Sequence, residues 1–319
     1  MPPHPSTGAK LKDIRMKIAF LFPGQGSQFA GMGRSLAASS PLARQTFEEA
    51  DDVLGFSLST LCFEGPDEAL KLTENTQPAL VAVSTAAWRI LAGRGLKPDY
   101  VAGHSLGEYS ALVAAGSLAF ADALRLVRQR GQYMQAAVPA GTGAMAALLY
   151  LPAGALDGIL AAAAEGEVVS AANLNSPGQI VIAGHAGAVA RAMELAKAAG
   201  AKRAIALPVS APFHCSLMAP AQLQMKAHLD RTTFNGLTVP LVNNWQAREI
   251  TSGTDARQGL YQQIPNPVRW EESVRHLAAQ GVTRAMEVGP GAVLMGLVRN
   301  IAPAIATVRA GEAEDMAAL

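Results

Sequence analysis

The stretch Gly103-His104-Ser105-Leu106-Gly107 decides the fold of this 319-residue chain. It follows the short apolar run 100–102 and precedes a helix-like segment, 108–115. A serine between two glycines at a strand-to-helix turn is typical of a nucleophile elbow, where flanking side chains would collide. Such a turn exposes the serine oxygen at a helix N-terminus, whose free N–H groups can bind an oxyanion. The alternative is a glycine-rich turn with an ordinary N-cap serine, but the strand before and the helix after favour the elbow.

Strands alternate with helical patterns on both sides of this turn. An apolar strand is predicted at 17–22 and ends in the glycine loop 23–28. The remaining predicted elements of this kind are helices at 40–53, 78–94, 121–136, 218–229, 270–279 and 293–301, and strands at 237–242 and 283–288. This alternation indicates an α/β fold class with a mostly parallel sheet covered by helices.

The pattern changes between residues 138 and 207. The elements predicted there are strand 144–149, helix 153–164, strands 168–173 and 179–183, helix 187–199 and strand 203–207. This order, β-α-β-β-α-β, is the split unit of ferredoxin-like folds. We therefore expect an inserted ferredoxin-like subdomain at 138–207, within a large catalytic domain formed by 16–137 and 208–319. Residues 1–15 are polar and contain prolines, so we expect a disordered extension without the apolar centre of a signal peptide.

The composition excludes several function classes. Half of the residues are hydrophobic, 16% are charged and the net charge is +1, which describes a globular protein with no electrostatic case for nucleic acid or membrane binding. No apolar run reaches the roughly 20 residues that span a bilayer. The two cysteines, Cys62 and Cys215, form neither a disulfide framework nor a metal-binding spacing. We expect a cytoplasmic protein without a metal.

A serine nucleophile needs a base that accepts its proton, and six histidines compete for this role. Five of them fall in the tail, beside the serine, in the insert or on predicted helices: His4, His104, His185, His228 and His276. His214 differs because it lies in the loop 210–215, just after the last strand of the insert. Such loops carry catalytic groups on α/β scaffolds, so elimination favours His214 as the base.

No acidic residue is an obvious partner for this histidine. An α/β hydrolase has an Asp or Glu between the serine and the histidine in chain order. The candidates fall on predicted helices or in the insert, and none clearly ends a strand: Glu108, Asp122, Asp157, Glu165, Glu167 and Glu194. We therefore expect a Ser–His dyad in which a backbone carbonyl or an amide orients the imidazole.

Arg130 interrupts the apolar face of the helix predicted over 121–136. The other members of that face are Ala123, Leu126, Val127, Tyr133 and Met134. A buried guanidinium is costly unless it is paired, and its planar fork matches a carboxylate with two hydrogen bonds. The pattern alone fits a structural ion pair with a core glutamate equally well. The position of Arg130 on the helix after the elbow favours a ligand carboxylate.

The glycine loop 23–28 offers a further candidate group. A backbone N–H in this loop, near Gln25 or Gln28, would complete an oxyanion hole with the N–H of Leu106. Phosphate binding is not favoured, because no Lys-Ser or Lys-Thr follows and the spacing is not G-x-G-x-x-G. Gln263, in a predicted extended loop, indicates little by itself.

Together these motifs resemble the malonyl-CoA:acyl carrier protein transacylases of fatty acid synthesis, and the acyltransferase domains of polyketide synthases look similar. The resemblance runs from about residue 17 to 308. It rests on the segments Phe22-Pro23-Gly24-Gln25-Gly26-Ser27-Gln28, Gly103-His104-Ser105-Leu106-Gly107-Glu108-Tyr109, Gln129-Arg130-Gly131, Asn175-Ser176-Pro177-Gly178-Gln179, Phe213-His214, Asn266-Pro267-Val268-Arg269-Trp270 and Glu287-Val288-Gly289-Pro290-Gly291. Several motifs in the family's order are far more specific than any one of them.

The resemblance implies a hydrolase-like α/β core with a ferredoxin-like insert, the organisation that periodicity also predicts. It implies that Ser105 is the acylated nucleophile and His214 its base. Arg130 would bind the malonyl carboxylate, while Gln25 and Leu106 would donate N–H groups to the oxyanion. The implied reaction is ping-pong transfer of a malonyl group from malonyl-CoA, through the serine, to the phosphopantetheine thiol of an acyl carrier protein.

Two further positions gain a role from the resemblance. In the family a main-chain carbonyl near the position of Gln263 orients the histidine, which would replace the missing acid. Phe213 stands where many stand-alone bacterial members have a serine, and polyketide domains with Phe there resemble malonyl users because the ring crowds an α-methyl group. This residue leaves the pathway, fatty acid or polyketide, open. No cofactor besides the substrates is implied, and we expect a monomer.

Two other functions compete with acyl transfer. A serine esterase or thioesterase would use the same elbow, but it needs water at the acyl-enzyme and has no obvious use for Arg130. A non-catalytic protein that docks a carrier is not favoured while Ser105, His214 and Arg130 are all present.

Overall fold

The computed structural model describes residues 16–209 and 211–319, so the predicted extension 1–15 and Ser210 of the histidine loop lie outside the described residues. The described part contains a six-stranded sheet and a four-stranded sheet. The larger sheet has the order β10 (Ala306–Ala310), β9 (Val282–Val288), β1 (Lys17–Phe22), β2 (Tyr100–Gly103), β7 (Leu241–Val242) and β8 (Glu249–Ile250). Only the edge pairing of β7 with β8 is antiparallel, so the prediction of a mostly parallel sheet is confirmed.

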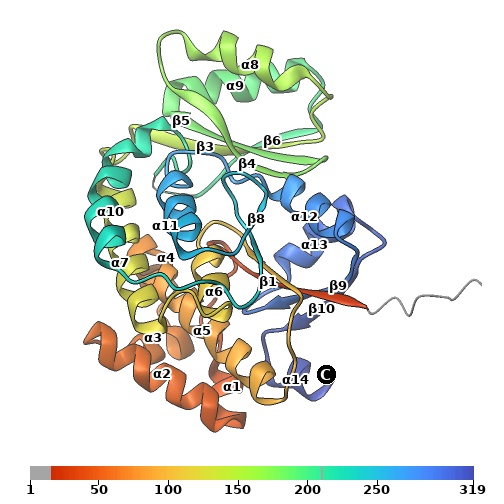
Figure 1. Ribbon diagram of the computed structural model, residues 1–319. Helices are drawn as coiled ribbons and strands as arrows, with labels where there is room; N and C mark the ends of the chain where they lie inside the picture. The colour runs from red at the N-terminus through yellow and green to blue at the C-terminus, as the bar shows by residue number, and fades with distance from the viewer. Residues whose placement is uncertain (1–15, 210) are drawn as a thin grey trace, which may run out of the picture.

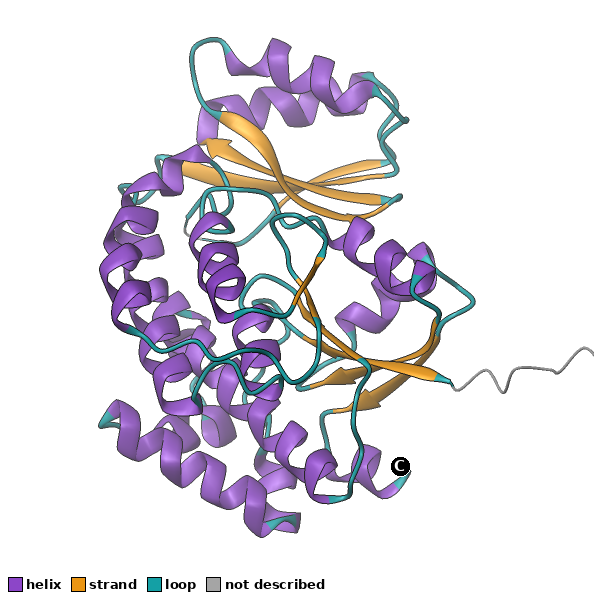
Figure 2. Cartoon of the chain, viewed as in Figure 1, coloured by secondary structure: helices purple, strands orange, loops and turns teal. Residues whose placement is uncertain are grey.

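Helices cover both faces of the larger sheet (Figure 2). The helices outside the smaller sheet are α1 (Arg34–Ser39), α2 (Pro41–Leu54), α3 (Leu58–Glu64), α4 (Asp67–Lys71), α5 (Thr73–Gly93), α6 (Gly107–Ala114), α7 (Phe120–Ala136), the 3-10 turn η1 (Ser216–Met218), α10 (Ala219–Arg231), α11 (Gly253–Gln262), α12 (Trp270–Ala279), α13 (Val293–Ile301) and α14 (Ala313–Ala317). No helix in the described part of the chain has the length and apolar character needed to cross a membrane.

Strand β1 separates two hydrophobic cores. Successive side chains of a strand point to opposite faces. Phe20 and Phe22 therefore pack into the core under α5, α6 and α7, whereas Ala19 and Leu21 pack into the core under α12 and α13. These two helix layers lie on opposite sides of the sheet (Figure 1). A strand covered on both faces explains why 17–22 reads as a continuous apolar run.

The smaller sheet forms one end of the molecule (Figure 1). Its elements are β3 (Gly143–Leu149), α8 (Ala155–Ala164), β4 (Val169–Ser176), β5 (Gln179–His185), α9 (Ala186–Ala198) and β6 (Arg203–Ala206). Its strands have the order β4-β5-β3-β6 with antiparallel pairing throughout, and α8 and α9 cover its outer face. The predicted β-α-β-β-α-β order is thus observed within 138–207, while the subdomain boundaries themselves stay a prediction.

Two predicted elements have different limits in the structure. The strand predicted at 237–242 is wrong over its first four residues, because Leu237 and Thr238 donate their backbone N–H groups to the β8–α11 turn and the end of α6. Pro240 has no N–H to add to a ladder. The helix predicted at 78–94 begins earlier, at Thr73, with Pro78 inside it. The carbonyl that this proline leaves without a helical partner instead accepts a hydrogen bond from Arg128.

Helix α11 was not predicted, and it changes the setting of Gln263. The sequence predicts an extended loop there, which is wrong: Gln263 is the C-cap of α11 and its side chain is fully buried. The N-cap Ser252 accepts a hydrogen bond from the Asp255 N–H, a start signal that the sequence does contain. Edge strand β10 was also missed.

Candidate active site

The turn between β2 and α6 has the geometry of a nucleophile elbow. Ser105 lies in the left-handed region, at φ 48°. A Cβ on Gly103 would come within 2.0 Å of Gly107 backbone atoms, and one on Gly107 within 2.0 Å of the Phe22 carbonyl oxygen. The N-cap of α6 is Leu106, without a side-chain cap, so Ser105 is not an ordinary N-cap serine. Both glycines are therefore required by the close approach of backbone to backbone.

Ser105 meets His214 directly across the site. The Oγ of Ser105 lies 2.7 Å from Nε2 of His214, and Nδ1 of His214 lies 2.8 Å from the backbone carbonyl oxygen of Gln263. A carbonyl only accepts, so Nδ1 carries the proton and Nε2 presents its lone pair to the serine hydroxyl. This tautomer makes Nε2 the atom able to take the serine proton. The orienting group is a main-chain carbonyl, one of the two kinds that the absence of a suitable acid predicts.

His214 is held in its neutral form by its surroundings. It is buried, and its backbone lies in the left-handed region at φ 60°. Burial, and next the positive charge of Arg130, lower the pKa of His214 to about 3. A general base must be unprotonated before it acts, and at neutral pH this imidazole meets that condition.

Arg130 is buried beside the nucleophile without a carboxylate partner. Its Nη2 donates to Ser105 Oγ and to Oε1 of Gln263, each at 3.0 Å, and its Nη1 donates to Oε1 of Gln77 at 2.9 Å. Its Nε has no hydrogen-bond partner among the described residues. No described carboxylate forms an ion pair with Arg130; Glu108, whose charge favours the protonated guanidinium, is joined to it by hydrogen bonds through the Gln263 amide.

These side chains face one small cavity of about 120 Å³. Six of the seven predicted site residues line it: Gln25, Ser105, Leu106, Arg130, Phe213 and His214. The seventh, Gln263, lies behind Arg130 and His214 and contacts both. The remaining wall is largely apolar and includes Met134, Met145, Leu207 and Val209. Pockets for drug-sized ligands typically measure roughly 300–1,000 Å³, so this cavity fits only a short acyl group.

Two backbone N–H groups border the cavity near the nucleophile. The N–H of Leu106 directly follows Ser105 at the N-terminus of α6. Gln25 lies in the β1–α1 loop, which presses on the elbow so closely that a Cβ on Gly24 would come within 2.3 Å of the His104 carbonyl oxygen. Neither N–H donates to any described residue. Free N–H groups at this position suit an oxyanion.

The sequence did not single out Asn244, which clamps the elbow. Its Oδ1 accepts from the Ser105 N–H at 2.6 Å, and its Nδ2 donates to the Gly103 carbonyl at 2.6 Å. It therefore holds both arms of the strained turn. A signal was present, because an asparagine pair follows β7 at the carboxyl edge of the sheet, where α/β folds carry functional groups. Gln77, a contact of Arg130 that the sequence also did not single out, lies near the start of α5 without such a signal.

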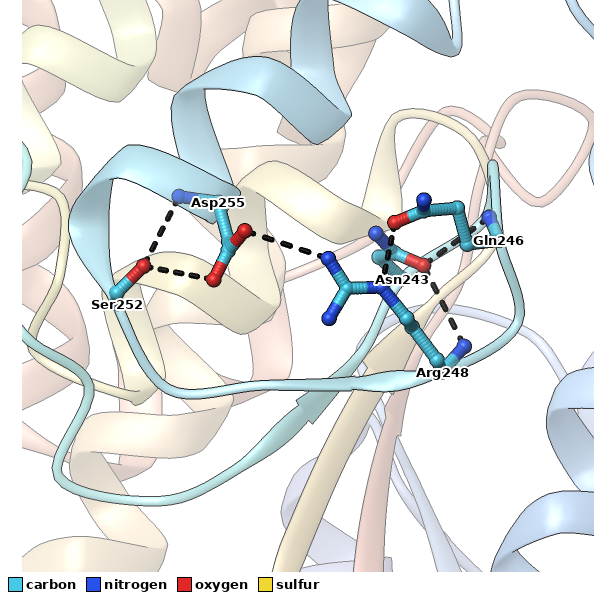
Figure 3. Close-up of polar contacts among 5 residues, drawn as sticks. All are labelled: Asn243, Gln246, Arg248, Ser252 and Asp255. Carbon is cyan, nitrogen blue, oxygen red and sulfur yellow. Dashed lines mark hydrogen bonds and ion pairs between the residues drawn. The ribbon is translucent and has the colours of Figure 1, made fainter.

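The loop that carries Asn244 is braced by polar contacts (Figure 3). Oδ1 of Asn243 accepts from the N–H groups of Gln246 and Arg248, and the Arg248 guanidinium contacts both Oε1 of Gln246, at 2.6 Å, and Asp255. Asp255 in turn shares hydrogen bonds with the N-cap of α11. These contacts link the segment after β7 to helix α11, whose C-cap is Gln263.

Comparison with known proteins identifies the family. The model of the acyl transferase domain matches residues 19–316. The chain belongs to this family. This acyl transferase is 52% identical over 303 residues to the malonyl CoA-acyl carrier protein transacylase of Escherichia coli K12, a match covering 95% of this chain and 98% of that protein.

Solved structures agree with this assignment. The acyl carrier protein S-malonyltransferase of Vibrio cholerae has a TM-score of 0.93 and 48% identity, covering 95% of this acyl transferase and 99% of that chain. The malonyl-transacylase solved in complex with its type II polyketide synthase acyl carrier protein has a TM-score of 0.92 and 46% identity, covering 94% and 98%. Both of these malonyl-transferring proteins thus share the fold of this chain.

The described residues of this acyl transferase contain no group of three or more His, Cys, Asp or Glu side chains that would hold a metal ion. The chemical groups described at the site are the serine hydroxyl, the imidazole, the guanidinium and two backbone N–H groups. That the enzyme uses no cofactor stays a prediction.

Proposed function

We propose that this acyl transferase moves a malonyl group from malonyl-CoA to the phosphopantetheine thiol of an acyl carrier protein, through a malonyl ester of Ser105, in fatty acid or polyketide synthesis. One observation carries the choice of malonyl. The Arg130 guanidinium is buried, lacks a carboxylate partner and donates to the nucleophilic oxygen at 3.0 Å. A malonyl group on that oxygen has its free carboxylate one methylene beyond the ester carbon, so it would supply the missing partner.

Acylation begins with neutral His214. Nε2 accepts the proton of Ser105 as Oγ attacks the thioester carbonyl carbon. The N–H groups of Gln25 and Leu106 bind the oxyanion of the tetrahedral intermediate. The intermediate collapses, the carbon–sulfur bond breaks, and coenzyme A leaves with the proton from His214. The enzyme then carries the malonyl ester.

The second half repeats these steps with another nucleophile. His214 accepts the proton of the carrier's phosphopantetheine thiol, and the sulfur attacks the ester carbonyl of malonyl-Ser105. The same N–H groups bind the oxyanion, and the serine oxygen leaves with the proton. The malonyl group therefore passes from the thiol of coenzyme A to the thiol of the carrier without hydrolysis, and the free enzyme is restored.

Specificity follows from charge and from size. An acetyl group leaves the Arg130 guanidinium without its carboxylate, and a buried unpaired donor is costly. A long acyl chain does not fit a cavity of about 120 Å³. Phe213, buried in the cavity wall, has its ring available to crowd an α-methyl group, so we propose a preference for malonyl over methylmalonyl.

The remaining partners follow the sequence expectations. We propose a monomer that meets coenzyme A and the carrier in turn and binds neither nucleic acid nor membranes. A cytoplasmic location is supported by the two cysteines, Cys62 and Cys215, which are both free and buried.

Release of coenzyme A tests transfer against hydrolysis. The enzyme is mixed with malonyl-CoA, and free coenzyme A is followed before and after the phosphopantetheinylated carrier is added. Transfer predicts roughly one equivalent, then a stall that the carrier relieves. An esterase or thioesterase predicts steady release without the carrier, and that result would overturn the proposal. The family comparison does not favour the hydrolase.

A further inference from the structure

Glu108, directly after the second glycine of the elbow, is a fully buried carboxylate in no ion pair with a described residue. Its Oε2 accepts two hydrogen bonds, from the backbone N–H of Asn244 and from Nε2 of Gln263, both at 3.0 Å. Its Oε1 has no partner among the described residues. Burial raises the pKa of Glu108 to about 7, against the lowering effect of Asn244, Arg130 and Gln263. Burying a carboxylate with so few hydrogen-bond partners is energetically costly, which indicates that it has a role in the site.

The hydrogen bond from Gln263 to Glu108 fixes the orientation of the Gln263 side-chain amide. A glutamine side chain donates from one end and accepts at the other. Because the carboxylate takes the donating end, the accepting Oε1 is turned toward Nη2 of Arg130, at 3.0 Å. The reverse orientation would set oxygen against carboxylate and NH₂ against guanidinium. The carboxylate, with the Ser105 carbonyl oxygen that accepts from the same Nε2 at 3.4 Å, thereby selects the amide orientation that holds the Arg130 fork beside Ser105.

The contact with Asn244 supports the elbow itself. The same Oε2 that binds Gln263 accepts the Asn244 N–H, while the Asn244 side chain bridges the Ser105 N–H and the Gly103 carbonyl. The serine is held at φ 48°, a conformation that surrounding contacts must maintain. Oε2 of Glu108 is thus linked to the turn that carries Ser105 through Asn244, and to the Arg130 guanidinium through Gln263.

We propose that Glu108 is a positioning residue for acyl transfer: it orients Arg130 through the Gln263 amide and steadies Ser105 through Asn244. Its side chain does not line the cavity and has no hydrogen bond to Ser105 Oγ, so its hydrogen bonds reach the site through these neighbours. The inference rests on the proposed function, because its readout is the preference for malonyl over acetyl groups.

Glu287 provides a matched control. It is equally buried and accepts two backbone N–H groups, those of Leu294 at 3.1 Å and Met295 at 2.8 Å. It lies at the end of β9, caps α13 and does not line the cavity. A variant of Glu287 therefore loses a comparable structural contact without touching the Arg130 network.

The test measures kcat/KM for malonyl-CoA and acetyl-CoA, together with the free energy of unfolding, in Glu108→Met, Glu108→Gln and Glu287→Met. Methionine keeps the volume and removes the acceptor, whereas glutamine keeps one acceptor oxygen. Because loss of a hydrogen bond to a charged group changes a rate or an affinity by about tenfold, Glu108→Met should lower the malonyl-to-acetyl ratio of kcat/KM about tenfold. Glu108→Gln should stay within about threefold of the wild type, and Glu287→Met should lose stability with an unchanged ratio.

The outcomes separate the inference from the function on which it rests. A folded Glu108→Met protein with the wild-type ratio overturns the inference, as does a Glu287→Met protein whose ratio falls equally. If Glu108→Met does not fold, Gln263→Met breaks the same relay while leaving the backbone carbonyl to His214, and an unchanged ratio there overturns the inference. A wild-type enzyme without malonyl preference contradicts the proposed function instead.

Discussion

The elbow segment 100–107 and the segment 241–263 both contribute residues to the site, yet the sequence predicts the role of the first far more directly than that of the second. The elbow carries its own explanation, because two glycines and a serine at fixed spacing define a turn whose backbone leaves no room for a Cβ. The second segment contributes Asn244 and Gln263 through contacts with Ser105 and Arg130, which lie more than 100 positions away in the sequence. Adjacent residues predict the local geometry of a turn, whereas they do not predict its contacts with residues far away in the sequence.

The two segments also differ in how they fail. A defect in the elbow disturbs backbone packing between β1, β2 and α6, so it affects folding. A defect in 241–263 removes side-chain hydrogen bonds to a turn that is already formed, so it affects the rate or specificity of acyl transfer. This contrast orders the expected effects of substitution.

The largest effect is expected from Gly107→Ala. The new Cβ would lie 2.0 Å from the Phe22 carbonyl oxygen, so β1 and the elbow must separate. We expect a loss of about 4 kcal/mol or more in the free energy of unfolding, measured by urea titration. Gly158→Ala in α8 is the control, since its Cβ meets nothing within 4 Å and should be neutral or stabilise by about 1 kcal/mol. Equal midpoints for the two variants would contradict the steric reading of the elbow.

The next largest effect is expected from Arg130→Ala, on specificity. Removing the guanidinium should lower kcat/KM for malonyl-CoA about a hundredfold and improve the relative use of acetyl-CoA, because the charged partner of the carboxylate is lost. Arg125→Ala, on the exposed side of the same helix, is the control and should change neither value. Unchanged malonyl preference in Arg130→Ala would sink the assignment of this residue as the carboxylate clamp.

Much of the core could be predicted from the sequence. Helices α12 and α13 and strand β1 begin and end where periodicity predicts, because each has a clear apolar pattern between turn residues. Residues 237–240 could not be predicted, since their partners are the C-terminus of α6 and the β8–α11 turn. An isolated apolar run gives no indication of where its N–H groups will be used.

The site residues also divide into those that a local sequence pattern predicts and those that it does not. Ser105, His214 and Arg130 each break a local pattern, as a serine between glycines, a histidine in a loop or a charge on an apolar helix face. Gln263 breaks no local pattern, because a buried amide is recognisable only from what it touches, and the signal for Asn244 is limited to its place after β7 at the carboxyl edge of the sheet. Gln263 received its role from family resemblance alone, and the helix that positions it was missed.

A smaller effect is expected from Asn244→Ala, which tests the distant support directly. Loss of the clamp on Ser105 should slow acylation by malonyl-CoA and by acetyl-CoA about tenfold each, leaving their ratio unchanged. Stopped-flow or quench-flow measurement of the first turnover gives both rates. Gln246→Ala, which removes only a contact to Arg248 in the same loop, should leave both rates intact. A full wild-type rate in Asn244→Ala would mean that the elbow needs no support from this segment.

The smallest effect is expected from pH. With the pKa of His214 near 3, the base stays neutral, and the acylation rate should be flat from pH 8 to 5.5. Protonation of Glu108, whose pKa is about 7, keeps an acceptor oxygen and should change the rate little. The contribution of His214 to stability falls as the pH falls from 6.5 to 3, by at most about 1.4 kcal/mol per unit, because the unfolded chain takes up a proton that folded His214 does not. Glu108 opposes this fall between about pH 7 and 4.5, because there the folded state takes up the proton first, so the net loss of stability is expected below about pH 4.5. A tenfold fall in rate with a midpoint near pH 6.5 would show that His214 is not kept neutral.

In the proposed mechanism Ser105 holds a carboxylated acyl group opposite Arg130. This arrangement can be tested by intact-mass analysis after exposure to an equimolar mixture of malonyl-CoA and acetyl-CoA. We expect a single malonyl adduct on the wild-type enzyme, no adduct on Ser105→Ala, and discharge of the adduct when the carrier protein is added. An adduct that forms at full rate on Ser105→Ala, or an equal mixture of malonyl and acetyl adducts on the wild type, would contradict it.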